Sequence, residues 1–198
     1  EARIAEMVGG LFLEMLGNDS PHALQGSFMA ESQADKVLAT ALRGLDPDGY
    51  TAPYRSVINN DERQFNAPGV RIPMCSLSRV EPAGSPTRPY REYHSSFDTP
   101  EIVGGPGLGK RLQASSDLVF AMLQAWERNQ VVVNHFKGEI FCSGYGIWVD
   151  HQVNPEGHRR LFDIMERFDG TRTIADMADE LGISFHATWE VVELLRHK

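Results

Sequence analysis

Apolar and polar positions in the first part of the chain follow two different periods. The run Val8-Gly9-Gly10-Leu11-Phe12-Leu13 ends in polar, turn-forming residues, which predicts a buried strand whose carboxyl end reaches a loop. Between positions 32 and 45 apolar or small residues recur at helical spacing, at Ala34, Val37, Leu38, Ala41, Leu42 and Leu45. Ser32 is a suitable N-cap for that helix. Ligands bind at the carboxyl ends of strands in open α/β sheets, so the pattern favours a site after Leu13.

The middle of the chain predicts two more strands and a long loop. The strands cover 54–58 and 70–80, and the polar, turn-rich segment 59–69 lies between them. A proline-rich stretch, 81–89, leads into the polar segment 90–99, and a loop of this length in a compact domain is usually functional or disordered. Apolar spacing returns over 115–129 and predicts an amphipathic helix there.

The last third changes from strand-like to helical character. Residues 131–149 are rich in β-formers, and Gly144-Tyr145-Gly146 suggests a bend between two strands. Helices are predicted over 161–168, 173–181 and 184–196, and Gly182 makes a tight turn between the last two, as in a helix-turn-helix unit. We therefore divide the chain into 1–128, a β-rich connection over 129–158, and a helical domain over 159–198.

Composition and charge narrow the range of partners. Among 198 residues, 41% are hydrophobic and 23% charged, which is typical of a globular protein. A net charge of −8 argues against general affinity for nucleic acid or anionic membranes, and no apolar run approaches the roughly 20 residues of a membrane span. Two cysteines without CxxC spacing favour a reducing compartment, so we expect a cytoplasmic protein.

The C-terminal helices are too acidic for a typical DNA-binding element. Residues 161–198 hold four lysine or arginine residues against eight acidic ones, and Glu190 and Glu193 lie on the helix that would enter the groove. Groove binding needs cations for the phosphates and amide or guanidinium groups for the bases. We expect these helices to pack against the rest of the protein or to form a homo-oligomer.

Side chains suited to metal or acid–base chemistry follow the predicted strands. They are Glu14, the cluster Asp61-Glu62-Arg63, and His94 with Asp98. Carboxylates and imidazoles are zinc ligands. Singly, each also has a structural explanation: a helix cap for Glu14, an Asx turn for Asp61, and a hydrogen-bonded loop histidine for His94.

Three motifs in order resemble the co-catalytic zinc exopeptidases, the group of bimetal aminopeptidases and glutaminyl cyclases. Phe12-Leu13-Glu14-Met15-Leu16-Gly17 is similar to the strand that carries a metal-binding acid, with Glu in place of the usual Asp. Asn60 to Pro73 is similar to the next motif, with an insertion near Pro68, and His94-Ser95-Ser96-Phe97-Asp98-Thr99 matches the metal histidine motif. The versions at Asp61 to Phe65 and Glu92 to Ser96 resemble a bacterial subfamily with a C-terminal winged-helix domain.

The resemblance implies a fold and a role for each matching residue. The chain would be the second half of a three-layer, mixed-sheet α/β zinc-peptidase domain, followed by a winged-helix domain. Glu14 and His94 would bind the two zinc ions, and Asp61 would orient substrate. Arg63, Phe65 and Tyr93 would bind the substrate, a small peptide or amide. Asp98 would fix the loop that carries His94.

The same resemblance leaves two alternatives open. A co-catalytic site also needs a further histidine, a bridging aspartate and a pair of glutamates, which this sequence does not supply in the pattern; we expect them before Glu1. One alternative is a catalytically degenerate relative that serves as a binding or assembly module. The other is a winged-helix regulator, which the acidic helix disfavours.

Overall fold

The computed structural model describes residues 4–82, 89–101, 105 and 107–196. The chain forms two compact units, residues 1–126 and residues 127–198, and each is described by itself. Within the described ranges, no helix combines the length and the apolar character that crossing a bilayer requires.

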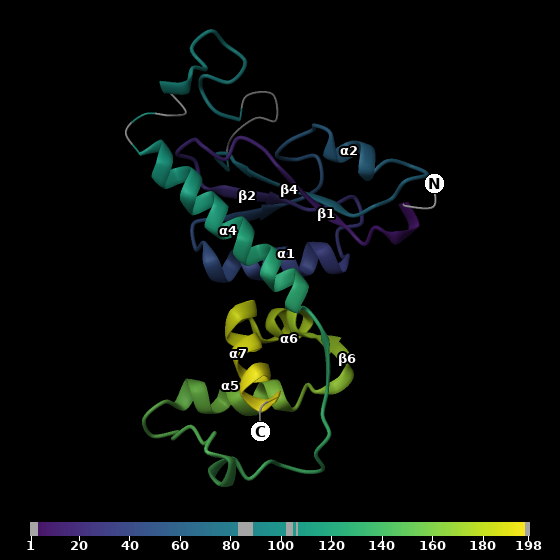
Figure 1. Cartoon of the computed structure of the whole chain (residues 1–198), viewed down its shortest axis with the longest axis vertical. Coiled ribbons are helices and arrows are strands. Elements are labelled where there is room, and N and C mark those ends of the chain that lie inside the picture. Colours follow the sequence, from purple (N-terminus) through teal and green to yellow (C-terminus); the bar gives the residue numbers. More distant parts are fainter. Residues whose placement is uncertain (1–3, 83–88, 102–104, 106, 197–198) are drawn as a thin grey trace. The chain divides into compact units, whose positions relative to one another are not determined.

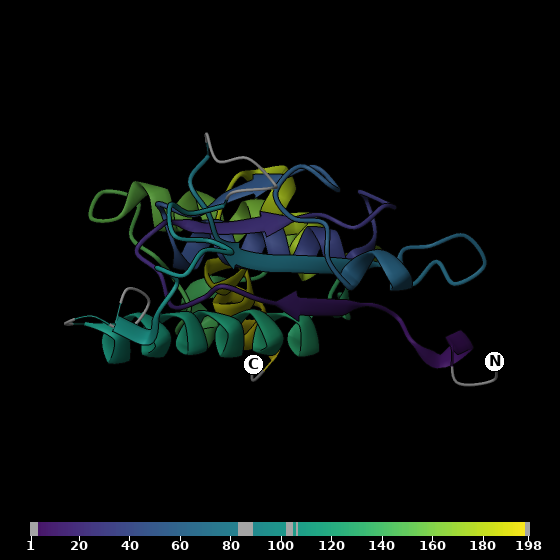
Figure 2. The ribbon, with the colours of Figure 1, turned by 90° about the horizontal axis from the view of Figure 1, so that it is seen from above.

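The first unit is built on a four-stranded mixed sheet. Its strands are β1 (Gly10–Leu13), β2 (His22–Gln25), β3 (Tyr50–Ala52) and β4 (Met74–Arg79). They lie side by side in the order β1-β4-β2-β3, which Figure 2 shows from above. Strand β1 runs parallel to β4, β2 runs parallel to β3, and β2 is antiparallel to β4. The carboxyl ends of β1 and β4 therefore meet at the same end of the sheet.

One face of this sheet packs against the long helices α1 (Gln33–Leu45) and α4 (Leu108–Arg128) (Figure 1). Because side chains alternate along a strand, Cys75 and Leu77 of β4 point to this face, and both are fully buried. The Cys75 thiol donates to Asp35 of α1 at 3.3 Å. Gly9, just before β1, lies so close to Trp126 and Ala34 that an added Cβ would come within 2.9 and 3.0 Å of their side chains.

Helix α1 begins and is buried as its sequence predicts. Ser32 accepts a hydrogen bond from the backbone of Asp35, whose carboxylate accepts from the backbone of Ser32, a complete capping box. Val37 and Leu38 on its apolar stripe have no exposed surface. The burial of this stripe against the sheet stabilises the helix more than its intrinsic propensity does.

The opposite face of the sheet is covered by the segment 53–72, which includes the short helix α2 (Glu62–Phe65) (Figure 1). Gln25, Ser76 and Ser78 point to this face, where strand pairing sets Gln25 opposite Ser76 and Ala23 opposite Ser78. These three polar side chains are at most 1% exposed. This face, called the polar face below, therefore carries buried polar side chains next to apolar ones such as Ala23.

The second unit is helical with a two-stranded antiparallel sheet. Its elements are β5 (Val131–Val133), a 3-10 turn η2 (Cys142–Tyr145), α5 (Pro155–Met165), β6 (Asp169–Thr173), α6 (Ile174–Leu181) and α7 (Phe185–Arg196). Strand β5 pairs with β6. The capping box of Thr173 and Asp176 starts α6, and Gly182, with φ of 64°, ends it in the left-handed conformation. Fully buried Ile164, Ile174 and Met177 lie in the core of this unit.

The α/β class with a mixed sheet is confirmed, but two predicted strands are wrong. Residues 54–58 form turns, because the amides of Val57 and Ile58 donate to the Gln25 side chain instead of to a neighbouring strand. Within 131–149 only Val131–Val133 is a strand, since the chain turns through η2 and closes at Gly146 in the left-handed conformation.

Other differences concern short elements and helix starts. Strands β2 and β6 were not predicted, and neither was β3 (Tyr50–Ala52), which ends just before the segment 54–58. Helix α4 begins at Leu108 instead of 115, and α5 begins at Pro155, where Asn154 caps it, instead of at 161. Helices α1, α6 and α7 lie where their apolar spacing predicts. The winged-helix topology and the domain limits at 128 and 158 stay predictions.

Candidate functional site

Glu14 lies directly after β1, at the shared carboxyl end of β1 and β4. Its amide donates to the carbonyl of Leu77 at 3.2 Å, which continues the pairing of the two strands. The next residue, Met15, leaves the strand with φ of 53°, a left-handed conformation that side chains with a Cβ rarely adopt. Such strained residues persist where the surrounding structure holds them, and they cluster at functional sites.

The two carboxylate oxygens of Glu14 have different surroundings. Oε2 accepts a hydrogen bond from Nδ2 of Asn60 at 2.9 Å. Oε1 is buried and has no hydrogen-bond partner among the described residues. Burial raises the pKa of Glu14 above its usual value, against the lowering effect of the Asn60 hydrogen bond, and the nearby charges of Glu62 and Asp61 raise it further. A cation at this carboxylate would relieve both the burial and the repulsion.

The loop that presents Asn60 is held from beneath by two buried side chains. Oε1 of Gln25 accepts the amides of Val57 and Ile58 at 2.9 and 3.0 Å. Glu62 has no exposed surface, and its two carboxylate oxygens accept the amide of Asn60 at 3.1 and 2.9 Å. These bonds fix the backbone on both sides of position 59, so the side chain of Asn60 is presented to Glu14 by a preorganised loop.

Asn66 ties the end of α2 to the sheet. Its Nδ2 donates to the carbonyls of Glu62 and Met74, both at 2.9 Å, and its Oδ1 accepts the amide of Phe28 at 3.0 Å. The residue is 2% exposed, so each of these bonds replaces hydration that burial removes. Asn66 therefore anchors α2 on the polar face of the sheet.

Beneath the loop, three buried polar atoms lack a partner among the described residues: Nε2 of Gln25 and the hydroxyls of Ser76 and Ser78. An unpaired buried polar group costs about 1–3 kcal/mol. Ser78 follows Leu77, which pairs with Leu13, so Ser78 and Glu14 hold corresponding positions at the ends of adjacent strands. The buried polar atoms without partners therefore continue along this face as far as the strand ends where Glu14 lies.

Asn60, Gln25, Ser76 and Ser78 were not among the predicted site residues, and Glu62 was predicted only as a member of the cluster Asp61-Glu62-Arg63. The alternation Ser-Leu-Ser within Met74–Arg79 was an available signal that one face of this strand is polar. The burial of that face by 53–72 has no local signature. Long-range bonds such as the one from Ile58 to Gln25 connect residues that sequence spacing does not relate.

Asp61, Arg63 and Phe65 lie around α2. Asp61 precedes the helix, is exposed and makes no side-chain capping bond. Arg63 is exposed, and Phe65 is 36% exposed. The structure therefore brings Asp61 into the electrostatic surroundings of Glu14 and leaves all three side chains accessible.

The segment that carries His94 has its own local order. His94 has φ of 55°, and the ring of Tyr93 stacks on it at a centroid distance of 3.9 Å with an interplanar angle of 16°. Tyr90 packs edge-on against Tyr93 and donates its hydroxyl to Asp98 at 2.7 Å. Burial and the Asp98 hydrogen bond raise the pKa of Tyr90 well above its usual value. The Tyr90–Asp98 hydrogen bond joins the two parts of the segment that precede and follow His94.

The predicted metal ligands are not brought together in the described part of the chain. No hydrogen bond or ring contact of the described residues joins His94 to Glu14, and Figures 1 and 2 draw the segment 89–101 apart from α2. Within the described ranges, no group of three His, Cys, Asp or Glu side chains is arranged to hold a metal ion. Glu14 offers an unpaired carboxylate oxygen, but the described residues do not supply further metal ligands beside it.

A family model described as "Domain of unknown function (DUF4910)" matches residues 1–129, well over half of the chain. The chain belongs to the DUF4910 family. The matched residues of this DUF4910 domain include the candidate site, with Glu14, the loop around Asn60 and His94.

A curated protein and a solved structure, both from Clostridium acetobutylicum, are similar to this DUF4910 protein over nearly its whole length. One, called a "Putative polysaccharide biosynthesis protein with aminopeptidase-like domain", is 22% identical over 189 residues, or 93% of this chain and 41% of its own length. The other is a crystal structure titled as a "putative peptidase", with a TM-score of 0.76 and 19% identity over 99% of this chain and 42% of that chain. The similarity supports a peptidase-like fold, and the DUF4910 chain spans about two fifths of either relative.

Proposed function

We propose that this chain contributes the second half of the active site of a metal-dependent, aminopeptidase-like hydrolase. The observation that carries the proposal is Glu14: a strand-end carboxylate with one oxygen held by Asn60, the other buried and unpaired, and a raised pKa. The relative named for an aminopeptidase-like domain and the fold shared with a structure titled as a peptidase support it.

Glu14 and His94 are the proposed metal ligands, and zinc suits their oxygen and nitrogen donors. Two zinc ions, with further ligands from outside this sequence, would lower the pKa of a water molecule and polarise the scissile carbonyl. Asn60 orients the Glu14 carboxylate through its hydrogen bond, the kind of outer contact that sets ligand geometry.

The remaining site residues act on the substrate or on the loops. Asp61 is proposed to orient the substrate amine, because it is an accessible carboxylate near enough to Glu14 for its charge to raise the Glu14 pKa. Arg63, Phe65 and Tyr93 are proposed to bind a small peptide or amide. Asp98 holds the hydroxyl of Tyr90 and so supports the loop that carries His94.

The second unit is proposed to be a winged-helix domain that acts in assembly. Its helix α7 carries Glu190 and Glu193, so association with a second copy or with the rest of the enzyme suits it better than contact with DNA. A cytoplasmic location remains part of this proposal.

Hydrolysis by the full-length protein that contains this chain tests the proposal. A panel of dipeptides and aminoacyl amides is assayed with the wild type and with Glu14→Gln, His94→Ala and the surface control Glu31→Gln. Activity should fall at least a hundredfold in the first two variants and stay at the wild-type level in the control. Full activity in His94→Ala would contradict the proposal, and inactivity of the wild type toward the whole panel would favour a degenerate binding module.

A further inference from the structure

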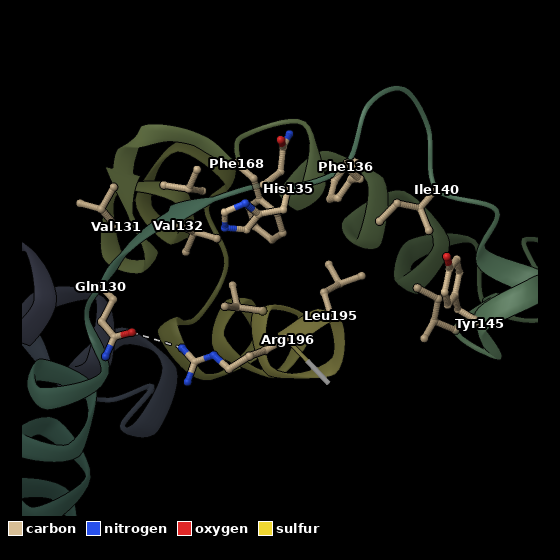
Figure 3. A pocket seen from close by; sticks show the side chains of 14 residues that line it. Gln130, Val131, Val132, His135, Phe136, Ile140, Tyr145, Phe168, Leu195 and Arg196 are labelled. Atoms are coloured by element: carbon tan, nitrogen blue, oxygen red, sulfur yellow. Dashed lines mark hydrogen bonds between the residues drawn. The ribbon is translucent and has the colours of Figure 1, made fainter. Parts of the chain in front are cut away.

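The second unit contains a hollow of about 560 Å³ between the segment 130–147 and helix α7 (Figure 3). All of its walls come from residues 130–196, so the hollow belongs to this unit alone. Its volume falls within the roughly 300–1,000 Å³ range of small-molecule sites. None of its lining residues belongs to the proposed hydrolase site.

Most of the wall is apolar. Valine, leucine, isoleucine and aromatic side chains predominate, with Val132, Phe136 and Ile140 on one side and Val192 and Leu195 on the other. Figure 3 shows Gln130 and Arg196 toward one end, Tyr145 toward the other, and apolar side chains between them. A ligand that fills such a space needs an apolar body, whose removal from water supplies most of its binding energy.

The permanent charge on the wall is positive. Arg196 carries the one permanent charge among the described lining residues, and none of those residues is an aspartate or glutamate. Glu193 pairs with Arg196 but does not line the hollow, so the wall itself presents a cation and no carboxylate to a ligand. This complementarity favours an acidic ligand over a neutral or basic one.

Arg196 is held in place at one end of the hollow. It donates to Oε1 of Gln130 at 3.2 Å (Figure 3). It also forms an ion pair with Glu193 at 3.0 Å, in which the Arg196 side chain is 51% exposed and the Glu193 side chain 24% exposed. A guanidinium has five N–H donors, so Arg196 can donate to a ligand carboxylate while it keeps its contacts with Gln130 and Glu193.

We propose that this hollow binds an amphiphilic carboxylate: an apolar chain or ring between α7 and the segment 130–147, with its carboxylate on Arg196. The inference does not depend on hydrolase activity. It gives the second unit a binding function of its own, in which a small acid occupies the space beside the α7 helix.

Calorimetric titration of the full chain with three ten-carbon probes tests this inference. Decanoate, decanol and decyltrimethylammonium are each titrated below their micelle concentrations. Decanoate should bind at one site, at least tenfold more tightly than decanol, and the cationic probe should bind most weakly. Arg196→Gln should reduce the decanoate affinity to that of decanol and leave the decanol affinity unchanged.

Two further variants locate the site. Val192→Phe places a larger side chain in the hollow and should abolish binding of both decanoate and decanol, with the fold checked by circular dichroism. Arg160→Gln removes another arginine that forms an exposed helical ion pair in this unit, with Glu156, and should change nothing. Equal affinity for the three probes, full decanoate affinity in Arg196→Gln, or no binding of decanoate by the folded wild type would each overturn the inference.

Discussion

Nδ2 of Asn60 donates a hydrogen bond of 2.9 Å to Oε2 of Glu14, and so joins the end of β1 to a loop 46 residues further along the chain. The contact is specific because the backbone amide of Asn60 donates to the buried carboxylate of Glu62, which fixes the residue. The loop fixes the donor, and the strand end fixes the acceptor. The orientation of the Glu14 carboxylate is therefore determined before any ligand arrives.

Replacing Asn60 with aspartate should raise the pKa of Glu14 further. The change removes the hydrogen bond that lowers this pKa and adds a carboxylate beside it. A pH titration of the Glu14 carboxyl carbon by NMR measures the effect. Asn59→Asp adds the same charge at the exposed neighbouring position and should shift the Glu14 pKa much less. Equal shifts in both variants would mean that the hydrogen bond contributes nothing.

Glu14→Gln should stabilise the metal-free protein at neutral pH. The pKa of Glu14 is raised in the folded state, so its stabilising contribution is complete below the usual value of 4.5 and is lost as pH rises through the folded pKa. Glutamine keeps an acceptor for Asn60 without the buried charge. Urea unfolding with a chelator present should show the variant more stable than the wild type at pH 7, and the difference should vanish below about pH 4.5. A variant less stable than wild type at pH 7 would contradict this prediction.

Two substitutions on the polar face should have opposite effects on stability. Gln25→Ala leaves the amides of Val57 and Ile58 without their acceptor and should lower the free energy of unfolding by about 1–3 kcal/mol. Ser76→Ala deletes a buried hydroxyl that has no partner and should raise it by about 1 kcal/mol. Urea denaturation gives both values, and hydrogen exchange should show faster exchange at Val57 and Ile58 in the first variant only. A loss of stability in both variants would mean that the Ser76 hydroxyl has a structural partner.

His22 should make the first unit less stable in mild acid. Its ring lies between the Asp46 carboxylate, 2.6 Å from Nδ1, and the Ser115 hydroxyl, 2.9 Å from Nε2. Burial lowers the pKa of His22 below 6.5, with Arg79 adding to this effect, although the hydrogen bond to Asp46 opposes it. The contribution of His22 to stability is therefore present above pH 6.5 and is lost as pH falls toward the folded pKa.

Urea unfolding between pH 7.5 and 5 checks the effect of His22. The free energy of unfolding should fall with pH in the wild type and fall less steeply in His22→Gln, since glutamine does not titrate. His186→Gln replaces an exposed histidine, 63% accessible at its side chain, and should keep the wild-type slope. The same slope in all three proteins would mean that protonation of His22 does not cause the loss of stability.

Local sequence signals predicted the elements whose determinants are local. The N-cap residue Ser32 and the apolar stripe through Val37 and Leu38 were sufficient to place α1. The strand over 54–58 was predicted wrongly because its amides bond to Gln25, a residue more than 30 positions earlier. Short strands such as β2 are set by their neighbours in the sheet, which a periodic pattern in four residues cannot specify.

The candidate site, too, could be predicted only where its determinants are local. Glu14 was placed by a local rule, an acidic residue immediately after an apolar run, although the strand β1 that this run forms is only partly buried. The pairing with Asn60 and the buried role of Glu62 depend on how the segment 53–72 folds over the sheet. In sequence, Glu62 is one charged residue among others, and only its burial distinguishes it from Asp61.

The most direct test of the central claim is the zinc content of the full-length protein that contains this chain. The wild type, Glu14→Gln and the exposed control Glu31→Gln are purified in parallel, equilibrated with zinc, desalted and measured by mass spectrometry. We expect the wild type and Glu31→Gln to retain up to two zinc ions per chain and Glu14→Gln to lose at least one of them. Equal zinc content in Glu14→Gln and the wild type would contradict the assignment of Glu14 as a metal ligand.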